Sequence, residues 1–301
     1  MLMMSTDQIF PKAQEKYNIV RTVEELRTKV EAWQKNGHQV GLVPTMGGIH
    51  DGHLSLVRKS AEIADRTVVS IFVNPTQFAP HEDLDSYPRD ENADASAISA
   101  AGADLIYCPP AHEMYPKGFE TSISVNTTST GLCGSSRPHF FGGVATVVCK
   151  LLNQCGPDFA VFGEKDFQQL LVIRRMTLDL DMPVKIIGAP IVRESDGLAM
   201  SSRNAYLTAD ERKIAGTLNK EMSEAISAIS KGGDIETCLD GLRVRLVKNG
   251  FTNIDYLEIR SGHDLRPIQT ATATANDQPR LFAATQLGRT RLIDNMPIFS
   301  E

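Results

Sequence analysis

An alternation of apolar runs with helix-period segments between residues 39 and 192 constrains the fold of this chain more than any other feature. The apolar runs are QVGLV, TVVSIFV, ADLIYC, DFAVFG and PVKIIGAPIV, and the segments among them predict helices at residues 53–64, 90–101, 143–153 and 168–180. Because single helices join consecutive apolar strands, we expect right-handed crossovers and a parallel sheet covered on both faces. Such a sheet binds ligands beyond the carboxyl ends of its strands.

The pattern changes after Val192. A polar loop, RESDGLAMSSRNAYL, precedes predicted helices at residues 209–230 and 235–248, and Thr208 with Glu211 predicts a capping box at the first of them. Three strand-like runs follow, IDYLEI, RLFAATQL and TRLIDN, and the low-complexity run TATATANDQ at residues 270–278 is typical of a flexible loop. Helices followed by a small antiparallel sheet predict a second, α+β domain. The fold class expected for the whole chain is therefore α/β with a smaller α+β domain.

Charge and cysteine usage narrow the class of protein. The 301 residues carry 31 Lys and Arg against 37 Asp and Glu, a formal net charge of −6, so the balance predicts no nucleic-acid surface. The five cysteines form no CxxC pair and fit neither a disulfide framework nor a zinc ribbon, which favours a reducing compartment. No run reaches the roughly 18 apolar residues of a membrane span. We therefore expect a cytoplasmic protein with no nucleic-acid or membrane partner.

The segment PTMGGIHDGH places two histidines in a glycine-bearing loop between an apolar strand and a helix. Strand, loop and helix start in this order direct backbone N–H groups and the positive end of the helix dipole toward a ligand. Gly47, Gly48 and Gly52 let the backbone approach that ligand closely. The imidazoles of His50 and His53 can stabilise charge that grows on a phosphate during its transfer.

Two other interpretations of the histidines stay open from the sequence alone. His50, Asp51 and His53 could bind a metal ion, although no further well-spaced ligand is visible and the metal ligands are unknown. The two imidazoles could instead be structural groups that are hydrogen-bonded at a helix cap.

Two later segments carry basic residues that suit a phosphate. FGEKDFQQL follows an apolar strand, so Lys165 would lie at the carboxyl edge of the sheet, and Gln169 could read a hydroxyl or a carboxylate. In RESDGLAMSSRN, Ser201, Ser202 and Arg203 offer two hydroxyls and a guanidinium to a triphosphate. Taken alone, each segment is more often a solvated polar loop.

Uncharged amides follow the second strand of the predicted sheet. In FVNPTQF, Asn74 and Gln77 face the same edge and suit recognition of a small polar substrate. Arg137, in SSRPHFFGGVATVV, is the last basic candidate near the site. The acidic run EDLDSYPRD, residues 82–90, is either a surface loop or part of a lid.

Together these motifs resemble the pantothenate synthetase family, the pantoate–β-alanine ligases, within the nucleotidyltransferases that carry a His-x-Gly-His signature. PTMGGIHDGH, FVNPTQF, FGEKDFQQL, VRESDGLAMSSRNAYL and TRLIDN occur in the family's order, and the similarity runs from near Tyr17 to the C-terminus. The resemblance implies an AMP-forming ligase of pantothenate biosynthesis that uses ATP with Mg2+. Pantoate and ATP would give pantoyl adenylate and pyrophosphate, and β-alanine would then release AMP and pantothenate.

The resemblance also implies an architecture. Residues 1–191 would form a Rossmann-like domain that binds nucleotide and pantoate, residues 192–301 would form a lid domain, and the chain would be a homodimer. His53 is implied as the proton donor, and the residue pattern adds His50, Lys165 and Arg203 as donors that stabilise charge. The resemblance implies that Gln77 and Gln169 contact pantoate and that Gln77 also lies near β-alanine. The residue pattern adds Asn74 and Arg137 to these contacts. The implied ATP contacts are Met46, Gly47, Gly48, His50, Gly52, His53, Gly163, Glu164, Lys165, Asp166, Val192, Met200, Ser201, Ser202 and Arg203.

One segment departs from the family pattern. The usual RPGHFRGVATVV is RPHFFGGVATVV here, so Phe140 and Gly142 stand where the family has a histidine and an arginine. We therefore expect the polar work of this segment to fall on Arg137.

Two other functions are alternatives to the ligase. One is a nucleotide-binding protein that has lost catalysis, and the intact histidines, Lys165 and the Ser-Ser-Arg segment argue against it. The other is an adenylyltransferase that stops at a dinucleotide, which has no use for Gln77 and Gln169 as readers of a small acid.

Overall fold

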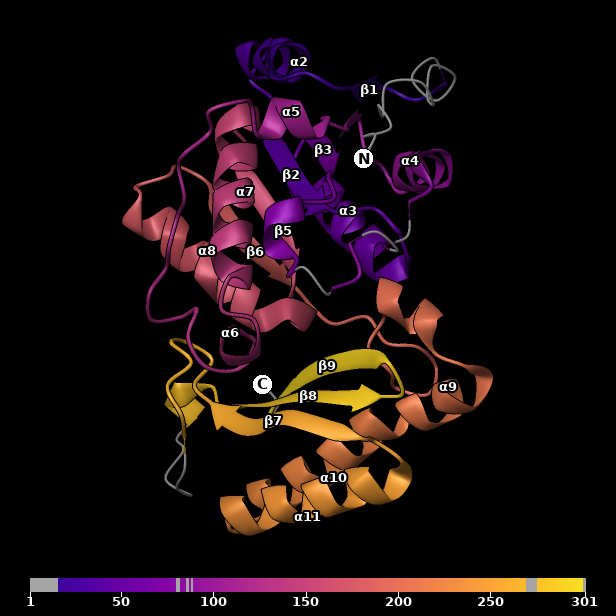
Figure 1. The fold of residues 1–301 in the computed structure, drawn as a ribbon. Coiled ribbons are helices and arrows are strands. Elements are labelled where there is room, and N and C mark those ends of the chain that lie inside the picture. Colours follow the sequence, from indigo (N-terminus) through magenta and orange to yellow (C-terminus); the bar gives the residue numbers. More distant parts are fainter. Residues whose placement is uncertain (1–15, 80–81, 85–86, 88, 269–274, 300–301) are drawn as a thin grey trace. The chain divides into compact units, whose positions relative to one another are not determined.

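The computed structural model describes residues 16–79, 82–84, 87, 89–268 and 275–299 (Figure 1). These residues divide into two compact units. Unit 1 contains the described residues up to Val125, together with His139–Gly163 and Val172–Ala189. Unit 2 contains Asn126–Pro138, Glu164–Leu171 and the described residues from Pro190 onward.

The division of the chain is thus interleaved. Residues 126–138 and 164–171 belong with the C-terminal part, which a single boundary at residues 191 and 192 does not describe. The assignment of a binding domain and a lid domain to the two parts stays a prediction. Residues 1–15 and most of the predicted loop at 270–278 lie outside the described residues, and the described end of that loop forms a 3₁₀ turn, η5 (Ala275–Asp277).

Unit 1 is built on a parallel sheet of six strands in the order β1-β4-β3-β2-β5-β6. The chain winds from β2 through β3 to β4 on one side and from β5 to β6 on the other, so the topological switch point lies between β2 and β5. β2 pairs with β3 along its whole length but with β5 at Gly41 and Leu42, near the amino ends of both strands. The strands are β1 (Ile19–Val20), β2 (Val40–Thr45), β3 (Arg66–Ile71), β4 (Leu105–Tyr107), β5 (Phe159–Gly163) and β6 (Lys185–Ala189).

Helices cover both faces of this sheet, as the continuous apolar strands predict. Val43, Val69 and Ile106 lie in one buried cluster with residues of α3 and α4. Side chains alternate along a strand, so Leu42 points to the opposite face, where α2 and α7 pack against each other and against β2. The helices are α2 (Val23–Lys35), α3 (Asp51–Ile63), α4 (Glu91–Ala100), α5 (Ala111–Met114), α7 (Phe140–Cys155) and α8 (Phe167–Asp179), the last of which begins in unit 2.

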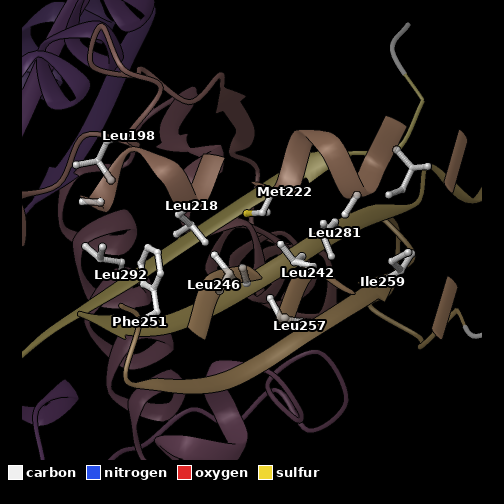
Figure 2. Close-up of a cluster of buried hydrophobic side chains, with 14 of the residues drawn as sticks. Leu198, Leu218, Met222, Leu242, Leu246, Phe251, Leu257, Ile259, Leu281 and Leu292 are labelled. Carbon is white, nitrogen blue, oxygen red and sulfur yellow. The ribbon is translucent and has the colours of Figure 1, made fainter. Parts of the chain in front are cut away.

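Unit 2 contains a three-stranded antiparallel sheet, β7 (Asn253–Arg260), β8 (Arg280–Leu287) and β9 (Thr290–Pro297). One face of the sheet packs on helices through a cluster that includes Leu218, Leu242 and Leu281 (Figure 2). The opposite face carries the side chains that alternate with these, among them Phe282. The helices of this unit are α6 (Cys133–Ser136), α9 (Ala209–Ala215), α10 (Thr217–Ser230) and α11 (Ile235–Asn249).

The predicted capping box is confirmed, but the single helix predicted at residues 209–230 is two helices. Thr208 Oγ1 accepts from the Glu211 N–H (3.3 Å), and Glu211 Oε2 accepts from the Thr208 N–H (2.8 Å). The break falls at Gly216, where the Thr217 hydroxyl donates to the carbonyl of Ile214 (2.7 Å). A threonine hydroxyl that bonds the preceding turn competes with the helical ladder.

The predicted fold class is confirmed: an α/β chain with a Rossmann-like parallel sheet and a smaller α+β part. Among the described residues, no helix has both the length and the apolar character needed to cross a membrane.

Candidate active site

The first predicted motif lies between β2 and α3, at the carboxyl end of a strand beside the switch point. His50 is the N-cap residue of α3, with extended backbone (φ −137°, ψ 172°), and its Nδ1 accepts from the Gly52 N–H at 3.1 Å. A ring nitrogen that accepts carries no proton, so the proton of a neutral His50 ring is on Nε2. His50 is thus placed to donate through Nε2 while its other nitrogen caps the helix.

The rings of the two histidines are neighbours. The His50 and His53 ring centroids are 4.0 Å apart with an interplanar angle of 33°, and both side chains are half-buried. The capping interpretation and the ligand-facing interpretation are compatible, because one nitrogen of His50 caps α3 while the other carries the ring proton. In the described part of the chain, no group of three or more His, Cys, Asp or Glu side chains could hold a metal ion.

A buried carboxylate that the sequence reasoning missed fixes this loop. Asp94 of α4 is 6% exposed, and its two oxygens accept from the N–H groups of Gly48 and Ile49, each at 2.9 Å. Burial raises the pKa of Asp94 above its ordinary value, against the opposing effect of these two bonds. Gly47 has φ +84°, and a Cβ there would lie 2.9 Å from Asp94 Oδ2, so the loop conformation requires glycine.

Four backbone N–H groups of this loop have acceptors within the protein. Those of Gly48 and Ile49 donate to Asp94, that of Gly52 donates to His50, and that of His53 donates to the His50 carbonyl at 2.8 Å. The acceptors come from the protein because α4 brings its carboxylate under the loop. Contact of this loop with a ligand through its backbone stays a prediction.

The amides that follow β3 are held in a buried network around Asn74, which is 1% exposed. Its Nδ2 donates to Gln77 Oε1 (3.1 Å) and to the Gly143 carbonyl (3.2 Å). Its Oδ1 accepts from the Tyr115 hydroxyl (2.8 Å) and from the hydroxyl of Thr76 (2.9 Å). Burial raises the pKa of Tyr115, which keeps it a neutral donor. Asn74 is thus buried and hydrogen-bonded to Gln77, and its contact with a substrate stays a prediction.

Gln77 joins two of the predicted motifs. It ends a 3₁₀ turn, η2 (Pro75–Gln77), and its Nε2 donates to Met46 Sδ of the β2–α3 loop at 3.0 Å. The carboxyl ends of β2 and β3 lie side by side in the sheet, so the loops after them meet. The structure therefore brings together the predicted ATP contact Met46 and the predicted pantoate contact Gln77.

In unit 2, the turn that carries Lys165 is held from β9. The turn is η3 (Glu164–Asp166), and Asn295 Nδ2 donates to the carbonyls of Glu164 (2.8 Å) and Lys165 (3.0 Å). The Lys165 side chain is 21% exposed, and its Nζ lies 3.8 Å from Asp166 Oδ2. TRLIDN is one of the family motifs in the sequence, but no local pattern in it predicts a role for Asn295.

The polar loop after Val192 forms a short hairpin. The Met200 N–H donates to the Val192 carbonyl at 3.0 Å, and Arg193 pairs with Ala199 in an antiparallel bridge. Arg193 also donates to both carboxylate oxygens of Asp294 in β9, at 2.6 and 2.9 Å. The next residues form a 3₁₀ turn, η4 (Ser202–Tyr206), which Ser201 caps by accepting from the Arg203 N–H at 3.3 Å. The four predicted ATP contacts from Met200 to Arg203 are thus consecutive residues on a structured turn.

The remaining candidates lie near α6 and α8. Gln168 is 5% exposed and holds residues 128–133, because it accepts from the Cys133 N–H (3.1 Å) and donates to the carbonyl of Thr128 (3.1 Å). Gln169 follows it and is half-buried, as is Arg137 at the end of α6. Phe140, one of the residues that depart from the family pattern, packs its ring 4.9 Å from that of Phe141.

The predicted residues are distributed over both units. Unit 1 holds Met46, Gly47, Gly48, His50, Gly52, His53, Asn74, Gln77 and Gly163. Unit 2 holds Arg137, Glu164, Lys165, Asp166, Gln169, Val192, Met200, Ser201, Ser202 and Arg203.

Comparison with known proteins gives one family. The sequence model described as Pantoate-beta-alanine ligase matches residues 18–297 of the chain. Pantothenate synthetase from Paramagnetospirillum magneticum is 51% identical over 282 residues, which cover 93% of this chain and 98% of the relative. Pantothenate synthetase from Caulobacter vibrioides is 52% identical over 285 residues, which cover 93% of this chain and 98% of that relative.

Solved structures agree with the sequence matches. The crystal structure of pantothenate synthetase from Thermus thermophilus has a TM-score of 0.86 at 41% identity and covers 94% of this chain and 100% of its own. Pantoate-β-alanine ligase from Francisella tularensis, complexed with β-γ ATP and β-alanine, has a TM-score of 0.78 at 30% identity. The match covers 95% of this chain and 99% of that structure. With a family match over almost its whole length and relatives near half identity, this chain belongs to the pantoate–β-alanine ligase family.

Proposed function

We propose that this chain catalyses the ATP-dependent condensation of pantoate with β-alanine, through a pantoyl adenylate, and releases AMP and pyrophosphate. The observation that carries the proposal is the histidine pair at the start of α3. This chain belongs to the family, and the ring centroids of His50 and His53 lie 4.0 Å apart. Both residues follow the carboxyl end of β2, beside the switch point of the sheet.

In the first step, the pantoate carboxylate attacks the α-phosphorus of ATP. Negative charge grows on the phosphate oxygens and on the departing pyrophosphate, so hydrogen-bond donors must surround both. We assign this role to His50, His53, Lys165 and Arg203. His50 donates through Nε2 as a neutral ring, because Gly52 holds its Nδ1, and the cationic part of the work belongs to Lys165 and Arg203.

Recognition of pantoate belongs to the amides Gln77 and Gln169 in this proposal. Neutral amides bind hydroxyl and carboxylate groups without drawing charge away from the reacting phosphate. The support for Gln77 is that Asn74 and Met46 fix its amide from two sides. An amide that is fixed before the substrate arrives loses little entropy on binding.

In the second step, the β-alanine amine attacks the acyl carbon of the adenylate and AMP departs. The amine must be neutral when it attacks, and none of the residues assigned above is a strong general base. We therefore assign most of the rate to positioning of the amine against the acyl carbon.

Mg2+ enters the proposal as part of the substrate. Triphosphate oxygens are ligands that Mg2+ prefers, and they would carry the ion into the site with ATP. A homodimer remains an expectation from the family resemblance, and a cytoplasmic location remains an expectation from the cysteine usage. Size-exclusion chromatography with light scattering tests the dimer.

Omission of each substrate in turn tests the function. We expect pyrophosphate release from ATP to require pantoate, and AMP to appear together with pantothenate only when β-alanine is present. The variant His53→Ala should lower the adenylation rate by on the order of 10²–10³, the cost of losing one donor to the developing charge. Equal pyrophosphate release with an unrelated acid would contradict the substrate assignment, and a wild-type rate in the variant would remove His53 from the mechanism.

A further inference from the structure

We propose that Asn295 of β9 is a positioning residue for adenylation, which acts by fixing the backbone turn from which Lys165 extends. The inference rests on the proposed function, because it needs Lys165 to hold a phosphate of ATP. It assigns a role to the motif TRLIDN, which supplies none of the residues that the proposed mechanism uses.

The geometry is that of one amide that bridges two consecutive carbonyls. Asn295 Nδ2 donates to the carbonyl oxygens of Glu164 (2.8 Å) and Lys165 (3.0 Å). Two adjacent peptide carbonyls that point at the same nitrogen fix the orientation of both peptide planes. Since the Lys165 Cα lies between these planes, the direction in which its side chain leaves the turn is fixed as well.

The opposite end of the amide is held by a cation. Arg280 of β8 donates to Asn295 Oδ1 from Nε (2.9 Å) and from Nη2 (2.7 Å). A guanidinium only donates and a carbonyl only accepts, so the side chain between them must accept at one end and donate at the other. Asparagine meets both demands, whereas aspartate would offer an oxygen to the two carbonyls.

The bridge stands on a rigid support. Asn295 is 2% exposed and lies opposite Phe282 in the β8–β9 ladder. The Arg280 guanidinium lies 4.2 Å from the centroid of the Phe167 ring, which in turn is 5.9 Å from the ring of Phe282. The Arg280 guanidinium that holds the amide is therefore packed against the ring of Phe167, the first residue of α8.

Lysine needs such support more than most residues. Its ammonium lies at the end of a flexible four-carbon side chain. The position of the ammonium therefore depends on the position of the backbone at this residue and on how tightly the side chain is packed. The Lys165 side chain is only 21% exposed, so the stem is confined and a shift of the turn would carry Nζ with it. A misplacement of about 1 Å at a reacting group can cost on the order of 100-fold in rate.

A double-mutant cycle tests the inference. Asn295→Asp keeps the shape and the acceptor for Arg280 but removes both donors to the turn. We expect pantoate-dependent exchange of labelled pyrophosphate into ATP, measured without β-alanine, to fall about 10- to 100-fold. In the Lys165→Ala background the same substitution should cost less than about threefold, because the side chain it positions is gone. Reaction of preformed pantoyl adenylate with β-alanine should stay within about twofold of wild type in Asn295→Asp.

The matched control is Asn249→Asp in α11. Asn249 Nδ2 donates to Glu221 Oε1 of α10 at 3.2 Å. The substitution therefore also removes a side-chain amide donor within the same unit. It should leave pyrophosphate exchange unchanged. If the circular dichroism spectrum of Asn295→Asp shows that this variant does not fold, the uncharged variant Asn295→Ser replaces it in the cycle.

Equal losses in the wild-type and Lys165→Ala backgrounds would overturn the inference, as would equal losses in both half-reactions. A wild-type rate of exchange in both Asn295 variants would also overturn it. A wild-type chain that shows no pantoate-dependent exchange contradicts the proposed function itself, and this result is seen before any variant is made.

Discussion

The loop geometry distinguishes the roles of the two histidines. His50 uses Nδ1 to accept from the Gly52 N–H at the start of α3, where the helix dipole disfavours a positive charge. A neutral His50 ring therefore has its proton on Nε2, and in the proposed mechanism it donates a hydrogen bond from Nε2 to a phosphate oxygen. The full positive charge that adenylation requires must come from other groups, which is why Lys165 and Arg203 carry weight in the proposed mechanism.

The contribution of Asp94 to stability depends on pH. Burial raises the pKa of this carboxyl from its ordinary value of 3.8, because the charged form is penalised more than its two N–H bonds favour it. The unfolded chain therefore releases this proton at lower pH than the folded chain. The contribution of Asp94 to the free energy of unfolding is greatest at low pH and declines as pH rises through the raised pKa.

The variant Asp94→Asn removes this titration. We expect the free energy of unfolding of the wild type minus that of the variant to fall as pH rises above 3.8 and then to level off. At the plateau the variant should still be less stable by about 1–3 kcal/mol, because Gly48 and Ile49 donate to different oxygens of Asp94 and the amide replaces one of these oxygens by an NH2 group, which cannot accept. Urea denaturation at a series of pH values measures the difference. A difference that stays constant or grows with pH would contradict the assignment.

The position of the candidate residues at strand ends was predictable from the sequence, whereas the residues that hold them were not. His50, His53 and Lys165 stand in local motifs next to strands, so their place at a strand end follows from the hydropathy pattern. Asp94 lies 46 residues from Gly48, and Asn295 lies 131 residues from Glu164. Such partners depend on how helices and strands dock in space, and nothing in a local pattern reports this.

At the scale of elements, strands were more predictable than helix boundaries. The five predicted strands of the parallel sheet are present, but the predicted start of α7 at residue 143 is three residues late, since the helix begins at Phe140. Helix α2 was missed although Thr22 and Glu25 form a capping box at its start. That signal, Thr-x-x-Glu before a helix-period segment, was available in the sequence.

The packing of α7 against η2 depends on a single glycine. A Cβ at Gly143 would lie 2.6 Å from the Thr76 carbonyl oxygen and 2.8 Å from the Gln77 nitrogen, so the backbone of η2 would have to move. Gly143→Ala should therefore displace Gln77 and raise KM for pantoate by about tenfold or more, with a smaller effect on KM for ATP. Steady-state kinetics with each substrate varied measures both values.

The adjacent glycine is a matched control. At Gly142, where the family usually has arginine, a Cβ would meet only the Ile123 carbonyl oxygen, at an ordinary 3.7 Å. Gly142→Ala should therefore leave both KM values unchanged and can stabilise α7 by up to about 1 kcal/mol. Equal effects of the two substitutions would mean that η2 does not depend on its contact with α7.

At the scale of the whole molecule, the two units have separate cores. The cluster that contains Val43 and Val161 lies within unit 1, and the cluster that contains Leu242 and Leu281 lies within unit 2. The change of pattern after Val192 predicted the second core. The assignment of residues 126–138 and 164–171 to unit 2 was not predictable, because it depends on long-range bonds such as those of Gln168 and Asn295.

Because the cores are separate, we expect a cavity in one unit to leave the amides of the other unit protected from hydrogen exchange. Leu242 is fully buried, so Leu242→Ala should cost about 2–5 kcal/mol in unit 2. We expect hydrogen exchange to accelerate in α10, α11 and β7–β9, while amides of β2 and β3 keep their wild-type rates. Leu42→Ala, at a position 1% exposed in β2, is the matched control and should give the reverse pattern. If either substitution accelerates exchange equally in both units, the chain opens as one cooperative body and the two cores do not define independent stabilities.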